Sequence, residues 1–190
     1  MKVKNFYRTG LAIMVFMTVY VIFFGLWAEA IINDSLPING PSVNVLYPLA
    51  VLTLTAVAGL CLYAYKKTWG WIVCAGFLTF FLVLTLAGTF FCMTADMLTP
   101  DLVIGMILQI LALGASVWLF FTSPMRDQFF AAEDYKIGNL IAMTVGTAIV
   151  IGGITLFPKL SRIVKPTVLT IALGTVALGI RWIMNINKHH

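Results

Sequence analysis

Reactive side chains are scarce in this 190-residue chain, and most of them fall where the sequence predicts helix ends or loops. The two histidines are its last residues, His189 and His190, and the three cysteines form no Cys-x-x-Cys pair. A metal or haem site needs several such ligands in one place, and an intramembrane proton relay needs a buried carboxylate or histidine. We therefore expect no metal site, no cofactor and no enzymatic activity.

Gln109 is the most notable polar residue within the apolar stretches, which otherwise hold Tyr20 and scattered threonines. A side-chain amide in a dry helical bundle needs hydrogen-bond partners. Gln109 could form an interhelical hydrogen bond worth ~0.6–2 kcal/mol. It could instead contact the headgroup of a bound lipid or ligand, and the sequence leaves both interpretations open.

A second candidate contact lies near the C-terminus, where Lys159, Arg162 and Lys165 are spaced by three residues. A helical turn would place all three charges on one side. They could rest on lipid headgroups, or they could bind a lipid phosphate or an acidic partner segment through charge-assisted hydrogen bonds. Both interpretations are kept.

The composition indicates which class of protein this chain belongs to. Apolar residues make up 61% of the chain and charged residues 10%, and the mean hydropathy is +1.01. Soluble domains are nearer half apolar and a quarter charged, and disordered chains are less apolar still. Both classes are excluded, and the chain is predicted to be a membrane protein that crosses the bilayer several times.

A spanning helix needs about 20 mostly apolar residues. Backbone groups in lipid must be satisfied within the segment, so the fold class is all-α, a single membrane domain over residues 1–190. The runs are too long and too uniformly apolar for barrel strands. Six spans are predicted: Gly10–Ala30, Leu46–Tyr65, Trp71–Cys92, Leu102–Phe121, Gly138–Phe157 and Thr167–Met184.

The distribution of basic residues predicts the orientation, because Lys and Arg are retained on the cytoplasmic side. With both termini inside, nine basic residues are cytoplasmic and three, Lys159, Arg162 and Lys165, are not. Trp69, Trp71 and Trp182 would then lie at the inner interface. The inner nine are Lys2, Lys4, Arg8, Lys66, Lys67, Arg126, Lys136, Arg181 and Lys188.

The inner segment after the fourth span predicts a short helix on the membrane surface. Ser123 suits the N-cap and Pro124 the first helical position. Met125 and Phe129 would share its apolar face, and Arg126 would turn to water.

Small residues predict where helices pack closely in lipid. The fifth and sixth spans each carry such residues on one face, so we expect these two spans to form a tight hairpin. The alternative is that one face contacts another protomer. The residues concerned are Gly138, Ala142, Gly146 and Gly153 in the fifth span and Thr170, Gly174 and Ala177 in the sixth.

Residues 46–130 resemble a recurring pattern in small bacterial membrane proteins of unknown function. The pattern combines a basic turn containing Trp69-Gly70-Trp71 with a Ser-Pro-x-x-Arg-x-x-Phe end at Ser123–Phe129. The resemblance implies a multi-pass protein of the bacterial inner membrane and carries no activity.

In size, span number and orientation the chain is also similar to the substrate-binding membrane components of energy-coupling vitamin transporters. Those proteins carry an Ala-x-x-x-Ala face on the first span, whereas this chain has Ala12 followed by Phe16. The likeness implies a ligand site capped by the first outer loop.

The functional expectation follows from two observations: the apolar stretches hold no cluster of metal ligands or catalytic groups, and two spans carry faces of small residues. We expect a non-enzymatic inner-membrane protein that acts by association, as a subunit or self-assembling module of a membrane complex. Its partners would be membrane lipids, further copies of itself or another membrane protein, and not nucleic acid. The alternative is a carrier or binding component for a small apolar or amphiphilic solute.

Overall fold

The computed structural model describes residues 3–35, 43–94, 99–130 and 137–156, together with Thr170, Gly174, Ala177 and Arg181. Within these ranges the chain is all-helical apart from short turns, as the sequence predicts. The helices are α1 (Val3–Ser35), α2 (Val43–Ala64), α3 (Thr68–Thr94), α4 (Pro100–Phe120), α5 (Ser123–Arg126) and α6 (Ile137–Leu156).

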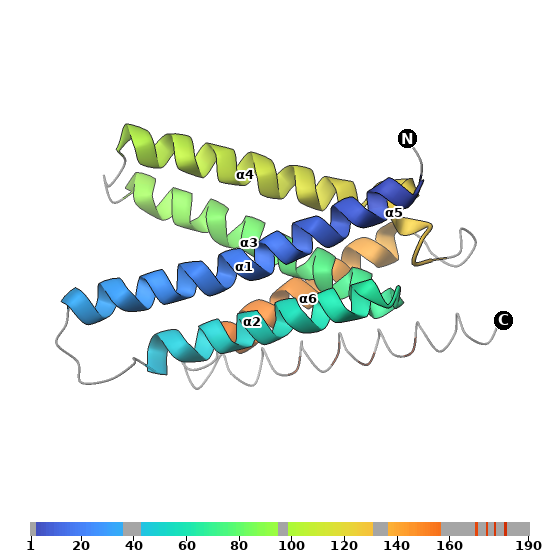
Figure 1. Cartoon of the computed structure of the whole chain (residues 1–190), viewed down its shortest axis with the longest axis horizontal. Helices are drawn as coiled ribbons and strands as arrows, with labels where there is room; N and C mark the ends of the chain where they lie inside the picture. Colours follow the sequence, from blue (N-terminus) through green and yellow to red (C-terminus); the bar gives the residue numbers. More distant parts are fainter. Residues whose placement is uncertain are drawn as a thin grey trace.

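Successive long helices run in opposite directions (Figure 1). The start of α1, the turn between α2 and α3, the short helix α5 and the start of α6 therefore gather at one end of the bundle, here called the N-terminal end. α3 occupies the centre and packs against α2, α4 and α6, while α1 packs mainly against α2. α1 and α4 make much less contact with each other.

Five of the described helices are long and apolar enough to cross a membrane. They correspond to the first five predicted spans, and among the described residues the ranges that meet this criterion are Asn5–Phe23, Tyr47–Ala64, Thr68–Thr94, Pro100–Phe120 and Ile137–Leu156. The predicted sixth span, residues 167–184, lies outside the described residues except for four single positions.

In the core, α3 packs closely against α6. Trp71, Cys74 and Phe77 of α3 are fully buried. Gly76 faces Thr147 of α6, and a Cβ atom built on this glycine would lie 2.7 Å from the Thr147 Cβ. A residue without a side chain therefore allows the two helices to approach closely, as small residues do in membrane bundles.

A group of large side chains joins five helices at the N-terminal end and is here called the N-terminal cluster: Tyr7, Tyr63, Trp71, Phe120, Met125 and Phe129. Tyr63 is fully buried at its centre. Its ring stacks on Tyr7 at 5.3 Å between centroids and lies 4.7 Å from Phe129. Its hydroxyl donates to the Met125 sulfur at 2.9 Å. The cluster therefore combines apolar burial with side-chain hydrogen bonds.

Hydrogen bonds to backbone carbonyls extend this connection between helices. The Trp71 indole donates to the Phe120 carbonyl at 3.1 Å, and the Tyr7 hydroxyl donates to the Ala64 carbonyl at 2.9 Å. Trp71 is fully buried, although the sequence assigns it to the lipid interface. The reason is that α3 starts directly after a tight turn, which directs its first residues into the bundle.

That turn consists of Tyr65, Lys66 and Lys67, and Lys66 has a positive φ of 52°. The prediction placed Gly70 in the linker, whereas it lies in the first turn of α3. A Cβ atom on Gly70 would collide with the backbone of Leu62 and Tyr63 at the end of α2. Glycine is therefore required where the two helices nearly touch.

The short helix α5 differs from its prediction in two respects. Its N-cap is Thr122 rather than Ser123, and its helical part ends at Arg126. Arg126 is buried, with 8% of its surface exposed, and does not turn to water. Met125 packs into the N-terminal cluster and carries Arg126 inward, where its guanidinium donates to the Ser123 hydroxyl at 3.0 Å.

Candidate functional site in the groove between α1 and α4

Because α1 packs on α2 and α4 packs on α3, a groove remains between α1 and α4. It holds a cavity of about 330 Å³. The walls are apolar except at Tyr20, Gln109 and Ser116. The lining residues are Ile13, Phe16, Met17 and Tyr20 of α1 and Gln109, Ala112, Leu113 and Ser116 of α4.

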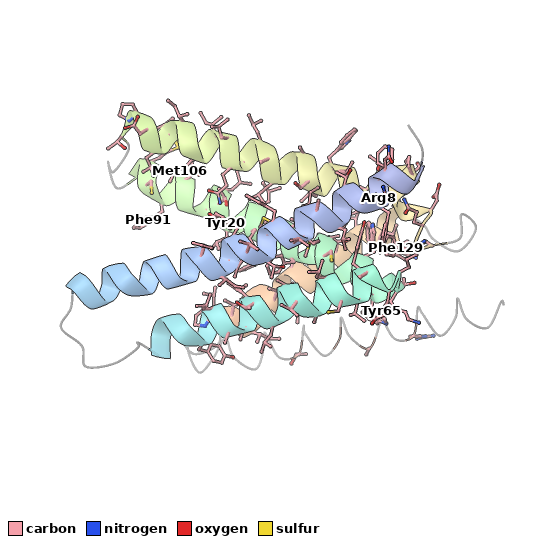
Figure 2. The ribbon with its side chains drawn as sticks, viewed as in Figure 1. Arg8, Tyr20, Tyr65, Phe91, Met106 and Phe129 are labelled. Carbon is pink, nitrogen blue, oxygen red and sulfur yellow. The ribbon has the colours of Figure 1, made fainter. Side chains whose placement is uncertain are left out.

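A polar pair crosses this groove. The Gln109 side-chain nitrogen donates to the Tyr20 hydroxyl oxygen at 3.3 Å, and both residues are partly buried. Figure 2 labels Tyr20 in the region between α1 and the pair α3 and α4. Within the described ranges Tyr20 is the hydrogen-bond partner of Gln109, so the Gln109 carbonyl oxygen and second N–H can still bind a guest.

The pair lies deep within the apolar part of the bundle. Tyr20 is twelve residues beyond Arg8 on α1, and Gln109 is eleven residues before Phe120 on α4. At 1.5 Å per residue, Tyr20 lies about 18 Å from Arg8 along α1, and Gln109 lies about 17 Å from Phe120 along α4. These distances are close to half the thickness of a bilayer's hydrocarbon core, which is about 30 Å.

A second cavity, of about 190 Å³, begins on the other side of the same pair. Tyr20 and Gln109 line both cavities, and Met106, also labelled in Figure 2, lines the second from α4. The remaining lining residues come from α3 and lead away from the N-terminal end: Phe81, Leu84, Thr85, Gly88 and Thr89.

None of the lining residues of either cavity is basic or acidic, and no group of three or more His, Cys, Asp or Glu side chains occurs in the described part of the chain. The groove therefore offers hydrogen bonding and shape, without a charge to pair with a ligand and without a set of metal ligands. It suits a ligand with an apolar body and an uncharged polar group.

The threonines near the cavities differ in whether their hydroxyls already have a hydrogen-bond partner. Thr85 and Thr89 donate to helix carbonyls four residues earlier, at 2.9 Å and 2.8 Å. This is the usual arrangement of threonine inside an apolar helix. Thr79 and Thr144 differ, because their hydroxyls have no hydrogen-bond partner within the described residues. Both line a separate cavity of about 370 Å³ between α3, α4 and α6.

Of the predicted contact residues, Gln109 lies in a groove and pairs with Tyr20, the other polar residue noted at depth. Lys159, Arg162 and Lys165 lie outside the described residues. The N-terminal cluster was not predicted, although the bulky aromatic residues at the ends of α2, α3 and α4 were a signal for it.

The small residues predicted to pack are placed in several ways. Gly138 and Ala142 are exposed, and Gly146 and Gly153 are half-buried. The buried face of α6 lies elsewhere, on Leu140, Met143, Thr144, Ala148, Ile151 and Thr155. The described positions of the sixth span, Thr170, Gly174 and Ala177, are exposed. The hairpin of the fifth and sixth spans stays a prediction, because most of its second helix is not described.

No protein-family model, curated protein or solved structure matches this chain. The two resemblances noted in the sequence therefore remain expectations. The function has to be argued from the geometry of the groove, the charges that line it and the exposure of the helices around it.

Proposed function

We propose that this protein binds a small, uncharged amphiphile inside the membrane, in the groove between α1 and α4. The observation that carries the proposal is the Gln109–Tyr20 pair, which places hydrogen-bonding groups at one end of an apolar cavity of about 330 Å³. The sequence alone favours association over ligand binding, whereas the polar pair in the groove supports ligand binding.

The chemistry of the groove supports this class of ligand. A hydroxyl or carbonyl group moved into hydrocarbon loses its partners in water, at a cost of several kcal/mol. The Gln109 amide can supply both a donor and an acceptor to such a group. The apolar wall around it, including Ile13, Met17 and Leu113, would hold the hydrocarbon part. A charged group would find no opposite charge there.

The proposed setting is a bacterial inner membrane with both termini in the cytoplasm. Its support is the nine-to-three distribution of basic residues over the predicted loops. In this orientation the N-terminal cluster lies at the cytoplasmic side, and the first cavity lies in the inner half of the bilayer. Membrane lipids are then the most abundant partners of the protein.

A photoreactive long-chain alcohol tests the proposal. The purified protein in mild detergent is irradiated with a diazirine-bearing hexadecanol and digested, and the labelled peptides are identified by mass spectrometry. We expect labelling within residues 13–20 and 109–116. Gln109→Leu should lower this labelling about 3- to 30-fold, the equivalent of one membrane hydrogen bond of ~0.6–2 kcal/mol.

Thr79→Val is the matched control, because it removes a hydroxyl from the separate cavity between α3 and α6. It should leave labelling of residues 13–20 and 109–116 unchanged. Labelling spread evenly over the lipid-facing residues, and insensitive to Gln109→Leu, would contradict a specific site.

Association is the second candidate function, and the exposure of α4 favours it. Of the 21 residues in α4, Leu113 and Phe120 are the ones that are buried. Ile104, Leu108 and Leu111 are all more than half exposed on this helix. Native mass spectrometry of the same preparation separates the candidates: a second copy or another protein in fixed ratio favours association, and a bound small molecule favours ligand binding.

A further inference from the structure

The two cavities of the groove meet at one pair of residues. The first extends from Tyr20 and Gln109 towards the N-terminal end, as far as Ile13 and Ser116. The second extends from the same pair in the opposite direction, as far as Thr89 on α3. The pair therefore separates two spaces that lie in opposite halves of the apolar layer.

We propose that this groove is a route by which an uncharged polar headgroup moves from one leaflet of the bilayer to the other, and that the Gln109–Tyr20 hydrogen bond closes it. The proposal rests on the proposed function, since it uses the same polar pair. It adds an activity, transbilayer movement, and assigns the second cavity to it.

Hydrogen-bonding groups are spaced along the route. Ser116 lies two turns from Gln109 on α4, and Thr85 and Thr89 continue beyond the pair on α3. The Thr85 and Thr89 hydroxyls donate to their own helix, but each oxygen can still accept a hydrogen bond. A headgroup that moves along the groove would meet a partner at each step, whereas in pure hydrocarbon it would meet none.

The lining also sets the selectivity of the route. Among the residues that the structure describes, its polar groups are hydroxyls and one amide, and none of the side chains that line either cavity is basic or acidic. A sugar or alcohol headgroup can exchange its hydrogen bonds with these groups. A phosphatidylserine headgroup would carry its charges through the apolar layer without a counter-charge, which is strongly unfavourable.

Gly88 is the position from which we choose to fill the second cavity. It lines that cavity, and a Cβ atom built on it meets no heavy atom within 4 Å. Gly105 of α4 is equally unobstructed and lines neither cavity. Gly88→Phe should therefore block the route, and Gly105→Phe is its matched control in a second membrane helix.

The experiment measures leaflet exchange in vesicles of phosphatidylcholine that contain the purified protein. The probes are glucosylceramide and phosphatidylserine, each with an NBD fluorophore on its acyl chain, and dithionite reduces the NBD exposed in the outer leaflet. We expect wild type and Gly105→Phe to speed exchange of the glucosylceramide. Gly88→Phe should return it to the rate of protein-free vesicles. Phosphatidylserine exchange should stay at that rate with every variant.

Two further variants test the hydrogen bond itself. Tyr20→Phe removes the oxygen that Gln109 binds but keeps the Gln109 amide, so the route should open more often and exchange should become faster. Gln109→Leu removes the polar group at the middle of the membrane, so exchange should become slower. Equal rates in these two variants would overturn the assigned closing role.

The remaining outcomes separate this proposal from ligand binding. Exchange that is unaffected by Gly88→Phe, or equally fast for phosphatidylserine, overturns the route. If wild type gives no exchange while the photoreactive alcohol still labels residues 13–20 and 109–116, the route fails and the binding function stands. Loss of that labelling in wild type removes both. Size-exclusion elution and thermal unfolding check that Gly88→Phe and Gly105→Phe are folded alike.

Discussion

Replacing Gly70 by alanine should destabilise the bundle, whereas the same change at Gly105 should not. Both glycines lie within helices, α3 and α4. A Cβ atom on Gly70 would collide with the backbone of Leu62 and Tyr63, and it would approach the Leu62 carbonyl oxygen to 2.6 Å. A Cβ atom on Gly105 meets nothing within 4 Å. The two substitutions are chemically identical and differ in their surroundings.

The expected difference can be worked out from these surroundings. Alanine is favoured over glycine inside a helix by about 0.5–1 kcal/mol, and this gain applies at both positions. At Gly70 the methyl group meets backbone atoms, which cannot rotate away, so α2 and α3 must separate. Overpacking of this kind costs about 1–3 kcal/mol. Gly70→Ala should therefore be about 1–3 kcal/mol less stable than Gly105→Ala.

Thermal unfolding in one detergent, followed by circular dichroism or by fluorescence-detected size exclusion, measures this difference. At about 2–4 °C per kcal/mol for a chain of this length, the Tm of Gly70→Ala should lie about 2–12 °C below that of Gly105→Ala. Equal values, or a higher Tm for Gly70→Ala, would show that α2 and α3 are not in backbone contact at their turn.

Two further predictions concern the N-terminal end of the bundle. Trp71→Phe should lower the free energy of unfolding by ~1–3 kcal/mol, because it leaves the buried Phe120 carbonyl without its indole donor. Trp118→Phe, at a position 71% exposed, should change this free energy little, and the same thermal unfolding assay compares the two variants. The distribution of basic residues predicts that a membrane-impermeant thiol reagent, added outside intact cells, labels Asp34→Cys and not Lys67→Cys in a cysteine-free background. The reverse labelling would contradict the orientation with the N-terminus inside.

The five long apolar helices of the described residues were predictable because hydropathy depends on composition, but their ends were not. The first span was predicted as Gly10–Ala30, whereas α1 runs from Val3 to Ser35. Hydropathy locates the apolar part of a helix, and the helix can continue through polar residues beyond that part. At the turn after α2, Gly70 was predicted to lie between two spans, whereas it belongs to α3, where a close helix contact requires it.

The two residues of the Gln109–Tyr20 pair could be predicted from the sequence, but their pairing could not. Tyr20 and Gln109 could each be recognised as polar residues at depth, since each interrupts an apolar run. That they bond to one another depends on α1 lying beside α4, and the order in which similar apolar helices pack is not encoded in their periodicity. Arg126 shows the same limit, because its spacing suits a surface helix while its burial follows from where Met125 packs.

The contact between Tyr63 and Met125 has a consequence for how the chain is made. These residues are 62 positions apart, and the Tyr63 hydroxyl donates to the Met125 sulfur. At a synthesis rate of about 5–20 residues per second, α2 leaves the ribosome about 3–12 s before its partner in α5 exists. The Tyr63 hydroxyl also donates to the Tyr7 carbonyl of α1, at 3.4 Å. Once α1 and α2 have packed together, this carbonyl can therefore serve as a partner for the hydroxyl until α5 brings Met125 beside it.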